Sequence, residues 1–146
     1  MSESKAYPLA CAWLNRIREA ERKVERIRQR IANLRMLTTD DSVHLTDMPR
    51  GSSPDQQKLA TLMAEIDESE RELAEAEIAL KAIRKEIVNT VNSLDNELLQ
   101  KILIFRYIQK MEWQEIATEI QYARSHTFRL YDQALAALEE HLRKGA

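Results

Sequence analysis

Residues 113–142 read WQEIATEIQYARSHTFRLYDQALAALEEHL, and the spacing of their apolar positions decides the fold of this part of the chain. The pattern predicts a short amphipathic helix from Trp113, a three-residue turn, and a longer helix that opens with Arg124, Ser125 and His126. The positions expected to face a core are Ile116, Ala117, Ile120, Ala123, Thr127, Leu130, Ala134 and Leu138. Small alanines suit two helices that cross steeply at close approach, so the segment indicates a helix-turn-helix.

A further helix is predicted just before this segment, in the sequence DNELLQKILIFRYIQKME, residues 95–112. Asp95 is its expected N-cap, because a short acidic side chain can accept hydrogen bonds from the first free backbone N–H groups. The apolar residues form a face wide enough to cover the helix pair that follows. They are Leu98, Leu99, Ile102, Leu103, Phe105 and Tyr107. Residues 95–146 are therefore expected to form a three-helix module.

Two longer helices are predicted upstream, because apolar residues recur there in alternating steps of three and four, the spacing of a coiled coil. The first stripe comprises Ala10, Trp13, Ile17, Ala20, Val24, Ile27, Ile31 and Leu34. The second comprises Leu59, Leu62, Ile66, Ser69, Leu73, Ala76, Leu80, Ile83, Ile87, Thr90 and Leu94. Pro8 fits the first turn of the first helix, where its missing N–H has no intrahelical partner.

The charges of these two helices are complementary. Residues 1–37 hold nine Lys or Arg and four Asp or Glu, a net +5, whereas residues 55–94 hold five and nine, a net −4. Opposite charges favour an antiparallel hairpin of the two helices over parallel pairing of identical copies. Dimerisation through the same stripes stays open, because identical heptads serve both geometries. The expected organisation is a long helical hairpin, residues 1–94, followed by the module at 95–146.

Residues 38–54 are the one stretch in which Pro, Gly, Ser and Asp cluster, and they are expected to form the loop between the long helices. Ser53 as N-cap, Pro54 at the first helical position and Asp55 in the first turn predict where the second helix begins. The residues Met48 to Gly51 within this loop suit an end cap of the hairpin, a disordered insertion or a partner site, and the sequence does not choose among them.

The composition of the chain indicates its fold class. The 146 residues include only two Gly and three Pro, and 32% of them are charged, so the fold class is expected to be all-α. The chain contains no apolar run of about 18 residues, and its first residues lack the pattern of a signal peptide, which predicts a cytoplasmic protein with no membrane partner. The single cysteine, Cys11, excludes an intrachain disulfide and is expected to be a small buried hydrophobe.

The sequence does not indicate an enzyme. Its three histidines, His44, His126 and His141, lie far apart, and none has an acidic or Cys partner at metal-ligand spacing. Gly-rich phosphate loops, nucleophile elbows and Cys pairs are missing from the sequence as well. We therefore expect no catalytic residues, no metal site and no cofactor.

One face of the predicted second helix of the pair, residues 124–142, is suited to double-stranded DNA. If Thr127, Leu130 and Ala134 face the core with Ala123, helical spacing turns Arg124, Ser125, Phe128 and Arg129 outward and places His126 on the flank. No acidic residue occurs between Glu119 and Asp132, so a local basic patch exists despite the net charge of −2. The interpretation is a recognition helix in the major groove.

Each exposed residue of this face has an expected role. Arg124 and Arg129 are candidates for bidentate guanine or phosphate contacts, and Ser125 and His126 for hydrogen bonds to phosphates or bases. Phe128 suits contact with a thymine methyl group, although packing against Trp113, Tyr131 or a second subunit explains it equally well. Two further phosphate candidates are Gln114 and Tyr122. Solvation alone is the competing explanation for the two arginines.

The motif LLQKILIFRYIQKMEWQEIATEI, followed by YARSHTFRLYDQALAAL, resembles region 4 of sigma-70 family factors. The resemblance is to the form found in small phage and prophage regulators of the ArpU/RinA-like type. The N-terminal part is similar to an uncharacterised phage-related group in which two long helices flank a Met-Pro-x-Gly element, here Met48 to Gly51. What the resemblance implies is a sequence-specific DNA-binding transcriptional regulator and, for some relatives, contact with RNA polymerase.

Three turn positions depart from the pattern of these relatives. Lys110 and Gln121 stand where the relatives usually have Gly, and Glu112 stands where a Ser or Thr cap is usual. A non-Gly residue held at positive φ costs on the order of 1 kcal/mol. The sequence therefore predicts either strained turns at these positions or turns reshaped by longer helices.

Two rival functions fit the same pattern. The first is a protein-interaction adaptor that binds RNA polymerase through this module without its own DNA binding, since a fold does not fix a function. The second is the small subunit of a phage DNA-packaging terminase, which also joins a helix-turn-helix to a coiled coil. A homodimer is compatible with the regulator, whereas terminase small subunits form rings, so a monomer or a dimer would count against that alternative. The oligomeric state, the target sequence and the sign of regulation are not encoded in any motif.

Overall fold

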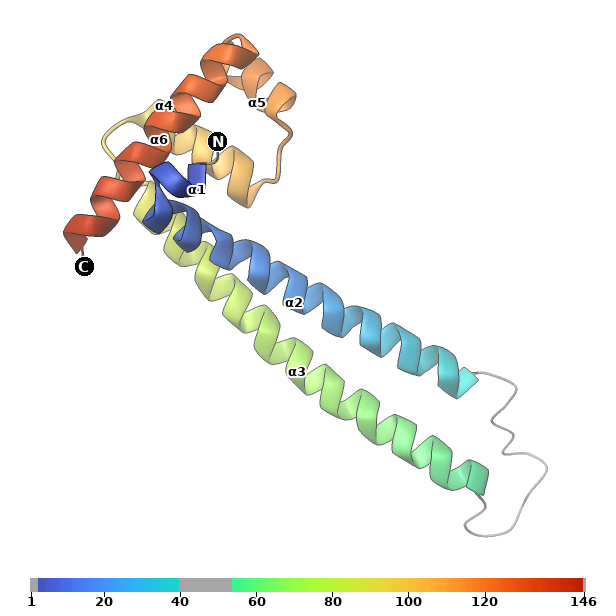
Figure 1. The fold of residues 1–146 in the computed structure, drawn as a ribbon. Helices are drawn as coiled ribbons and strands as arrows, with labels where there is room; N and C mark the ends of the chain where they lie inside the picture. Colours follow the sequence, from blue (N-terminus) through green and yellow to red (C-terminus); the bar gives the residue numbers. More distant parts are fainter. Residues whose placement is uncertain (1–2, 40–53, 146) are drawn as a thin grey trace. The chain divides into compact units, whose positions relative to one another are not determined.

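The computed structural model describes residues 3–39 and 54–145, and all regular structure within these ranges is helical (Figure 1), which confirms the all-α class. The helices in chain order are α1 Glu3–Ala6, α2 Pro8–Thr39, α3 Pro54–Val91, α4 Glu97–Leu103, the π-helix η1 Ile104–Ile108, α5 Trp113–Ile120 and α6 Arg124–Gly145. The proposed cap Ser53 and the Met48 to Gly51 element lie outside the described residues. Among the described helices, none is both long and apolar enough to cross a membrane.

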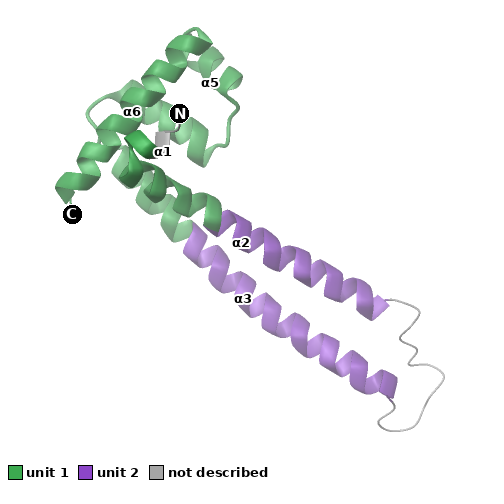
Figure 2. Cartoon of the chain, in the orientation of Figure 1, with its two compact units in different colours: residues 1–19, 81–146 green, residues 20–80 purple. Residues whose placement is uncertain are grey.

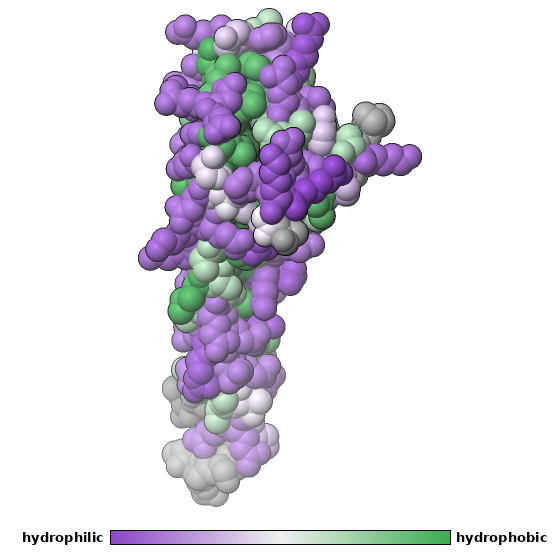
Figure 3. Space-filling model, turned by 90° about the vertical axis from the view of Figure 1, so that its left-hand side faces the viewer, coloured by the Kyte–Doolittle hydropathy of each residue, from purple (hydrophilic) through white to green (hydrophobic). Residues whose placement is uncertain are grey.

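The chain divides into two compact units (Figure 2). Unit 1 comprises residues 1–19 and 81–146, and unit 2 comprises residues 20–80. Both long helices, α2 and α3, contribute residues to each unit. Hydrophilic side chains predominate on the face of the molecule shown in Figure 3, as expected for helices rich in charged residues.

Unit 2 is held by the two apolar stripes expected from the sequence. Its core cluster consists of Val24, Ile27, Ile31 and Ala76, with Leu73 and Leu80 packed against it. Leu62, Ile66 and Ser69 of the second stripe are buried as well. Ser69 is a polar residue on this stripe, and its hydroxyl accepts a hydrogen bond from Nε of Arg30 at 3.2 Å. Burial of a polar hydroxyl is tolerated because that hydrogen bond replaces water.

Ion pairs flank this core on the surface. Arg28 pairs with Glu77 at 2.7 Å and Arg30 with Glu72 at 2.8 Å, and Arg35 pairs with Glu70. From one pair to the next, the residue number increases on α2 and decreases on α3, so the two helical segments of unit 2 run antiparallel. Each pair is about half exposed and contributes at most about 1 kcal/mol to the stability of the fold. The pairs therefore matter more for the register of α2 against α3 than for stability.

In unit 1, the beginning of α2 presents Leu14 to the interior rather than Trp13. Leu14 is buried, whereas Trp13 is only half-buried and its indole N–H donates to Glu86 at 3.3 Å. Arg16 donates to both oxygens of the same carboxylate, at 2.9 and 3.0 Å. The expected stripe was therefore wrong at Trp13, because the indole N–H finds a polar partner at the rim of the core.

The N-terminal segment of unit 1 is joined to α6 by hydrogen bonds. The hydroxyl of Tyr7 donates to Asp132 at 3.0 Å. The backbone N–H groups of Leu9 and Ala10 donate to the carboxylate of Glu139, at 3.3 and 2.7 Å. Since α2 begins at Pro8, these N–H groups belong to its first turn and have no acceptor within the helix. Glu139 therefore caps α2 from a different helix.

The start of α4 differs from the expected one. Asn96, not Asp95, is the N-cap, and its side-chain oxygen accepts from the N–H groups of Leu98 at 2.9 Å and Leu99 at 3.2 Å. The helix continues as η1, a π-helix that the apolar pattern did not indicate. The wider turn of a π-helix is a local insertion that a period of 3.6 residues cannot reveal.

The core of unit 1 lies beneath α6, against which both α4 and α5 pack. The buried residues of α5 and α6 are Ile116, Ala117, Thr127, Leu130, Tyr131, Ala134, Leu135, Leu138 and Glu139. Ala123 is exposed, so its expected place in the core was wrong. It belongs to the turn before α6, where helical spacing does not yet apply.

Candidate nucleic-acid interface

A left-handed turn joins α5 to α6. Gln121 has φ 64° and ψ 42°, and its N–H donates to the carbonyl of Thr118 at 3.3 Å. The next N–H, of Tyr122, donates to the carbonyl of Ala117 at 3.1 Å. These two bonds form the Schellman arrangement that ends many helices, usually with Gly at the left-handed residue. The expected strained turn is therefore found at Gln121.

The turn before α5 has a second left-handed residue. Lys110 has φ 59°, and the N–H of Met111 donates to the carbonyl of Phe105 at 2.9 Å. Glu112 takes the N-cap position with extended backbone, and its N–H donates to the Glu115 carboxylate at 2.9 Å. Glu112 thus occupies the position where a Ser or Thr cap was expected. Both turns have non-Gly residues, and α5 begins at Trp113 and α6 at Arg124 as expected, whereas α6 extends to Gly145, beyond the expected end at residue 142.

The exposure expected on α6 is also confirmed. Arg124, Ser125, Phe128 and Arg129 are exposed, and His126 on the flank is half-buried. On the opposite side of the same turns, Thr127 and Leu130 are buried. The two phosphate candidates outside α6, Gln114 and Tyr122, are exposed as well. The contacts of these residues with DNA remain predictions.

Aromatic contacts support this exposed face from behind. The rings of Trp113 and Phe128 have their centroids 5.0 Å apart, and those of Trp113 and Tyr131 lie 4.6 Å apart. The Arg106 guanidinium carbon lies 4.8 Å from the Trp113 ring centroid. Phe128 keeps 40% of its surface exposed while packing on Trp113. The packing explanation offered for Phe128 is therefore observed.

Two ring contacts involve polar residues of the exposed α6 face and the turn before it. The imidazole of His126 stacks on the ring of Tyr122, with the centroids 4.7 Å apart. The guanidinium of Arg124 lies 5.7 Å from the centroid of Phe128. The face therefore contains two contacting pairs, Arg124 with Phe128 and Tyr122 with His126.

The arginines of this face differ from those of α2 in their partners. Arg16 and Arg28 of α2 pair with carboxylates of α3, whereas Arg124 and Arg129 have no carboxylate partner among the residues that the structure describes. The first turn of α6 also contains no acidic residue. The backbone N–H groups at a helix N-terminus favour anions, so the two guanidinium groups add to a positive helix end.

Several residues near this interface were not identified from the sequence. The hydroxyls of Tyr107 and Tyr131 lie 2.6 Å apart, and burial raises the pKa of Tyr107 above its ordinary value of 10.0. Arg106 donates to the carbonyl of Met111 at 3.0 Å while covering Trp113. No sequence signal relates these residues, because the π-helix and the turn after it set their relative directions.

Buried Glu139 was also missed, although a signal for it existed. It follows Tyr131 and Leu135 at intervals of four residues, which places it on the apolar stripe of α6. A carboxylate on such a stripe indicates a buried hydrogen-bonding role. Within the described ranges, no group of three or more His, Cys, Asp or Glu residues is arranged to hold a metal ion. His44 lies outside those ranges.

Comparison with known proteins places most of this geometry inside one family. The matching family model is described as a protein of unknown function, DUF1492, and it covers residues 50–139. This range includes α5, its turns and the exposed face of α6. No curated protein and no solved structure matches the chain. Because the match extends over more than half of the 146 residues, the chain belongs to the DUF1492 family.

Proposed function

We propose that the protein is a sequence-specific, DNA-binding transcriptional regulator of the phage or prophage type. In this proposal, α5, the turn at residues 121–123 and α6 act as a helix-turn-helix of the sigma region 4 kind. The N-terminal part of α6 enters the major groove, where a helix of this size fits. The observation that carries the proposal is the exposed α6 face, on which Arg124 and Arg129 have no carboxylate partner among the described residues.

The long helices complete the proposal. The antiparallel ion pairs of unit 2 and the Arg16–Glu86 pair of unit 1 are the contacts expected if α2 and α3 form one hairpin arm. Dimerisation through the arm would present two such faces to two half-sites.

The test is binding of fluorescent duplex DNA across a series of salt concentrations. Phosphate neutralisation releases counterions, so the logarithm of the binding constant should fall linearly with the logarithm of salt concentration. If Arg124 or Arg129 contacts a phosphate, its replacement by Ala should lower the slope by about one and weaken binding to all sequences. If it contacts a guanine, the loss should be about 1–3 kcal/mol and should depend on sequence.

A matched control comes from the far end of the same helix. Lys144 is exposed and pairs with Glu140 at 3.3 Å, so Lys144→Gln changes the charge of α6 without touching the candidate face. Random-oligonucleotide selection with the wild-type protein and with Arg124→Ala identifies the preferred sequence. Equal DNA binding by wild type, Arg124→Ala and Arg129→Ala would refute the proposed face.

A second function is favoured by the carboxylates of α5. Glu112, the N-cap of α5, and Glu115 and Glu119 within α5 are exposed at intervals of three and four residues, which places acidic charge along this helix, where it would repel phosphates. An adaptor that binds a basic surface of RNA polymerase would use these groups. Such an adaptor shows no salt-dependent DNA binding, and Glu115→Gln with Glu119→Gln would weaken its capture by polymerase.

A further inference from the structure

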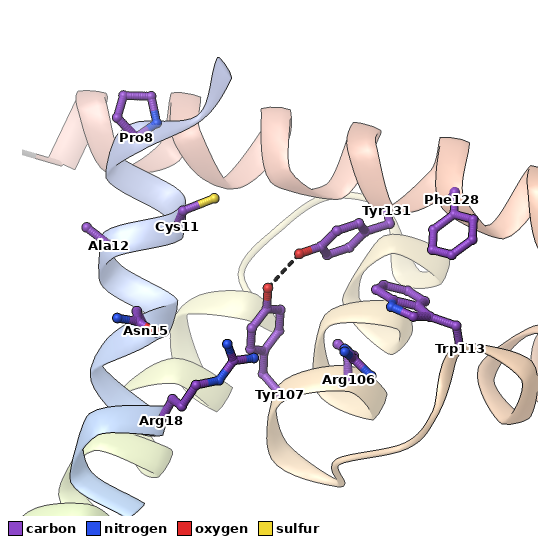
Figure 4. Close-up of a pocket in the computed structure, with 10 residues that line it drawn as sticks. All are labelled: Pro8, Cys11, Ala12, Asn15, Arg18, Arg106, Tyr107, Trp113, Phe128 and Tyr131. Carbon is purple, nitrogen blue, oxygen red and sulfur yellow. Dashed lines mark hydrogen bonds between the residues drawn. The ribbon is translucent and has the colours of Figure 1, made fainter. Parts of the chain in front are cut away.

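A cleft in unit 1 lies beside the candidate interface and has a different chemistry (Figure 4). Its volume is about 550 Å³, within the range of small-molecule sites. One wall is the start of α2, and the other is formed by η1, α5 and α6. The lining residues are Pro8, Cys11, Ala12, Asn15, Arg18, Arg106, Tyr107, Trp113, Phe128 and Tyr131.

Flat apolar surface dominates the wall opposite α2. Trp113 contacts both Phe128 and Tyr131, and Tyr107 is joined to Tyr131 through their hydroxyls. Figure 4 shows the four rings gathered on one side of the cleft, across from the helix that carries Cys11 and Ala12. Such a wall binds planar rings by stacking or by edge-to-face contact.

Positive charge lies at the same cleft. Arg18 projects from α2 toward Tyr107, and Arg106 lies over Trp113 (Figure 4). Neither guanidinium has a carboxylate partner among the described residues, and none of the ten lining residues is acidic. Arg106 donates one N–H to the carbonyl of Met111, and Asn15 contributes a side-chain amide to the lining of the cleft. Guanidinium groups recognise carboxylates and phosphates, so the cleft is built for an anion attached to a ring.

We propose that this cleft binds a small organic anion with a planar aromatic body, the ring against Trp113 and Tyr131 and the carboxylate or phosphate beside Arg18 and Arg106. The site is separate from the exposed α6 residues Arg124 and Arg129. It shares only Phe128 with the candidate DNA-binding face. The proposal therefore stands whether or not the protein binds DNA.

The experiment follows the indole N–H resonance of Trp113 by NMR, in a Trp13→Phe background that leaves Trp113 as the sole tryptophan. The probes are 2-naphthoate, its neutral counterpart 2-naphthamide, and acetate, which has the charge without the ring. We expect saturable shifts with 2-naphthoate at a Kd of about 1 mM, the affinity of a ligand with roughly a dozen heavy atoms. Naphthamide should bind about fivefold more weakly, because it lacks the one charge interaction, which is exposed to solvent. Acetate should cause no saturable shift.

Two variants and one control locate the site. Arg18→Gln should remove most of the preference for naphthoate over naphthamide, because it removes one of the two positive charges at the cleft, and Arg18 is an exposed residue. Ala12→Leu should weaken both ring probes by filling the cleft without loss of helix propensity. Arg22→Gln, one turn further along α2 and outside the lining residues, should change neither affinity.

Three results would overturn the proposal. One is the lack of a saturable shift with naphthoate at concentrations tenfold above the expected Kd. Another is equal affinity for naphthoate and naphthamide in the protein with Arg18 intact. The third is naphthoate binding that neither Arg18→Gln nor Ala12→Leu weakens, which would place the ligand elsewhere.

Discussion

Replacement of Glu139 should destabilise unit 1 far more than replacement of its neighbour Glu140. Glu139 is 4% exposed, and its carboxylate accepts hydrogen bonds from the N–H groups of Ala10 at 2.7 Å and Leu9 at 3.3 Å. Neither N–H has another acceptor within α2, because both lie in the first turn. The negative charge is also favourable at this positive helix end.

The size of the effect follows from these contacts. In Glu139→Ala, the Ala10 N–H is left buried without an acceptor and the Leu9 N–H is partly buried, and each loss costs about 1–3 kcal/mol. Since water can reach Leu9, we expect a total of about 2–4 kcal/mol. Glu139→Gln keeps one oxygen acceptor but loses the charge, and it should cost about half as much. Glu140 is exposed and, within the part of the chain that the structure describes, pairs only with Lys144, so Glu140→Ala should cost less than about 0.5 kcal/mol.

Urea denaturation followed by circular dichroism gives the free energies of unfolding, and amide hydrogen exchange gives a local measure. In Glu139→Ala, the N–H groups of Leu9 and Ala10 should lose protection, whereas Glu140→Ala should leave it intact. Equal destabilisation by Glu139→Ala and Glu140→Ala, or unchanged protection at Ala10, would show that Glu139 does not cap α2.

Three further outcomes are expected. Gln121→Gly should raise the free energy of unfolding by up to about 1 kcal/mol, because Gly adopts the left-handed backbone without strain. Gln133→Gly, in the middle of α6, should lower the free energy of unfolding by a similar amount. Denaturation midpoints that shift in the same direction for both variants would contradict this. The hydrogen bonds from Arg16 hold the pKa of Glu86 below its ordinary value of 4.5, so the stability they contribute is present above pH 4.5 and lost as pH falls through the lowered pKa. The difference in stability between wild type and Glu86→Gln, under about 1 kcal/mol for this half-exposed pair, should therefore be larger at pH 7 than at pH 3. Burial raises the pKa of Tyr107 above 10.0, so wild type should lose stability relative to Tyr107→Phe as pH rises through that pKa; parallel stability curves between pH 8 and pH 11 would exclude this.

Much of the local structure was predictable because it depends on residues close in sequence. The spacing from Trp113 to Leu138 predicted where α5 and α6 begin, and Pro54 marked the start of α3. Gln121 and Lys110 stood out as non-Gly residues at turn positions, and both have positive φ in the structure. The resemblance, which places Gly at these two positions, indicated the turns; the residues themselves do not favour a positive φ.

Errors arose where two local solutions compete or where regular spacing fails. Asp95 and Asn96 are both good caps, and the chain uses Asn96. Ala123 and Trp13 fitted a helical stripe, but Ala123 is exposed at the helix start and Trp13 lies at the rim of the core. The π-helix Ile104–Ile108 turns its side chains relative to the face predicted for a continuous α-helix.

The sequence by itself determined the helical class, the two apolar stripes, the complementary charge of α2 and α3, and the exposed Arg124 to Arg129 face. These depend on periodicity and composition, which each segment contains within itself. Only the tertiary structure decided that Glu139 caps a helix about 130 residues away and that Arg18 lines one cleft with Trp113 and Tyr131. The physical reason is that a cap or a cleft depends on where separate helices meet, and that position is fixed by the packing of the whole core rather than by any one helix.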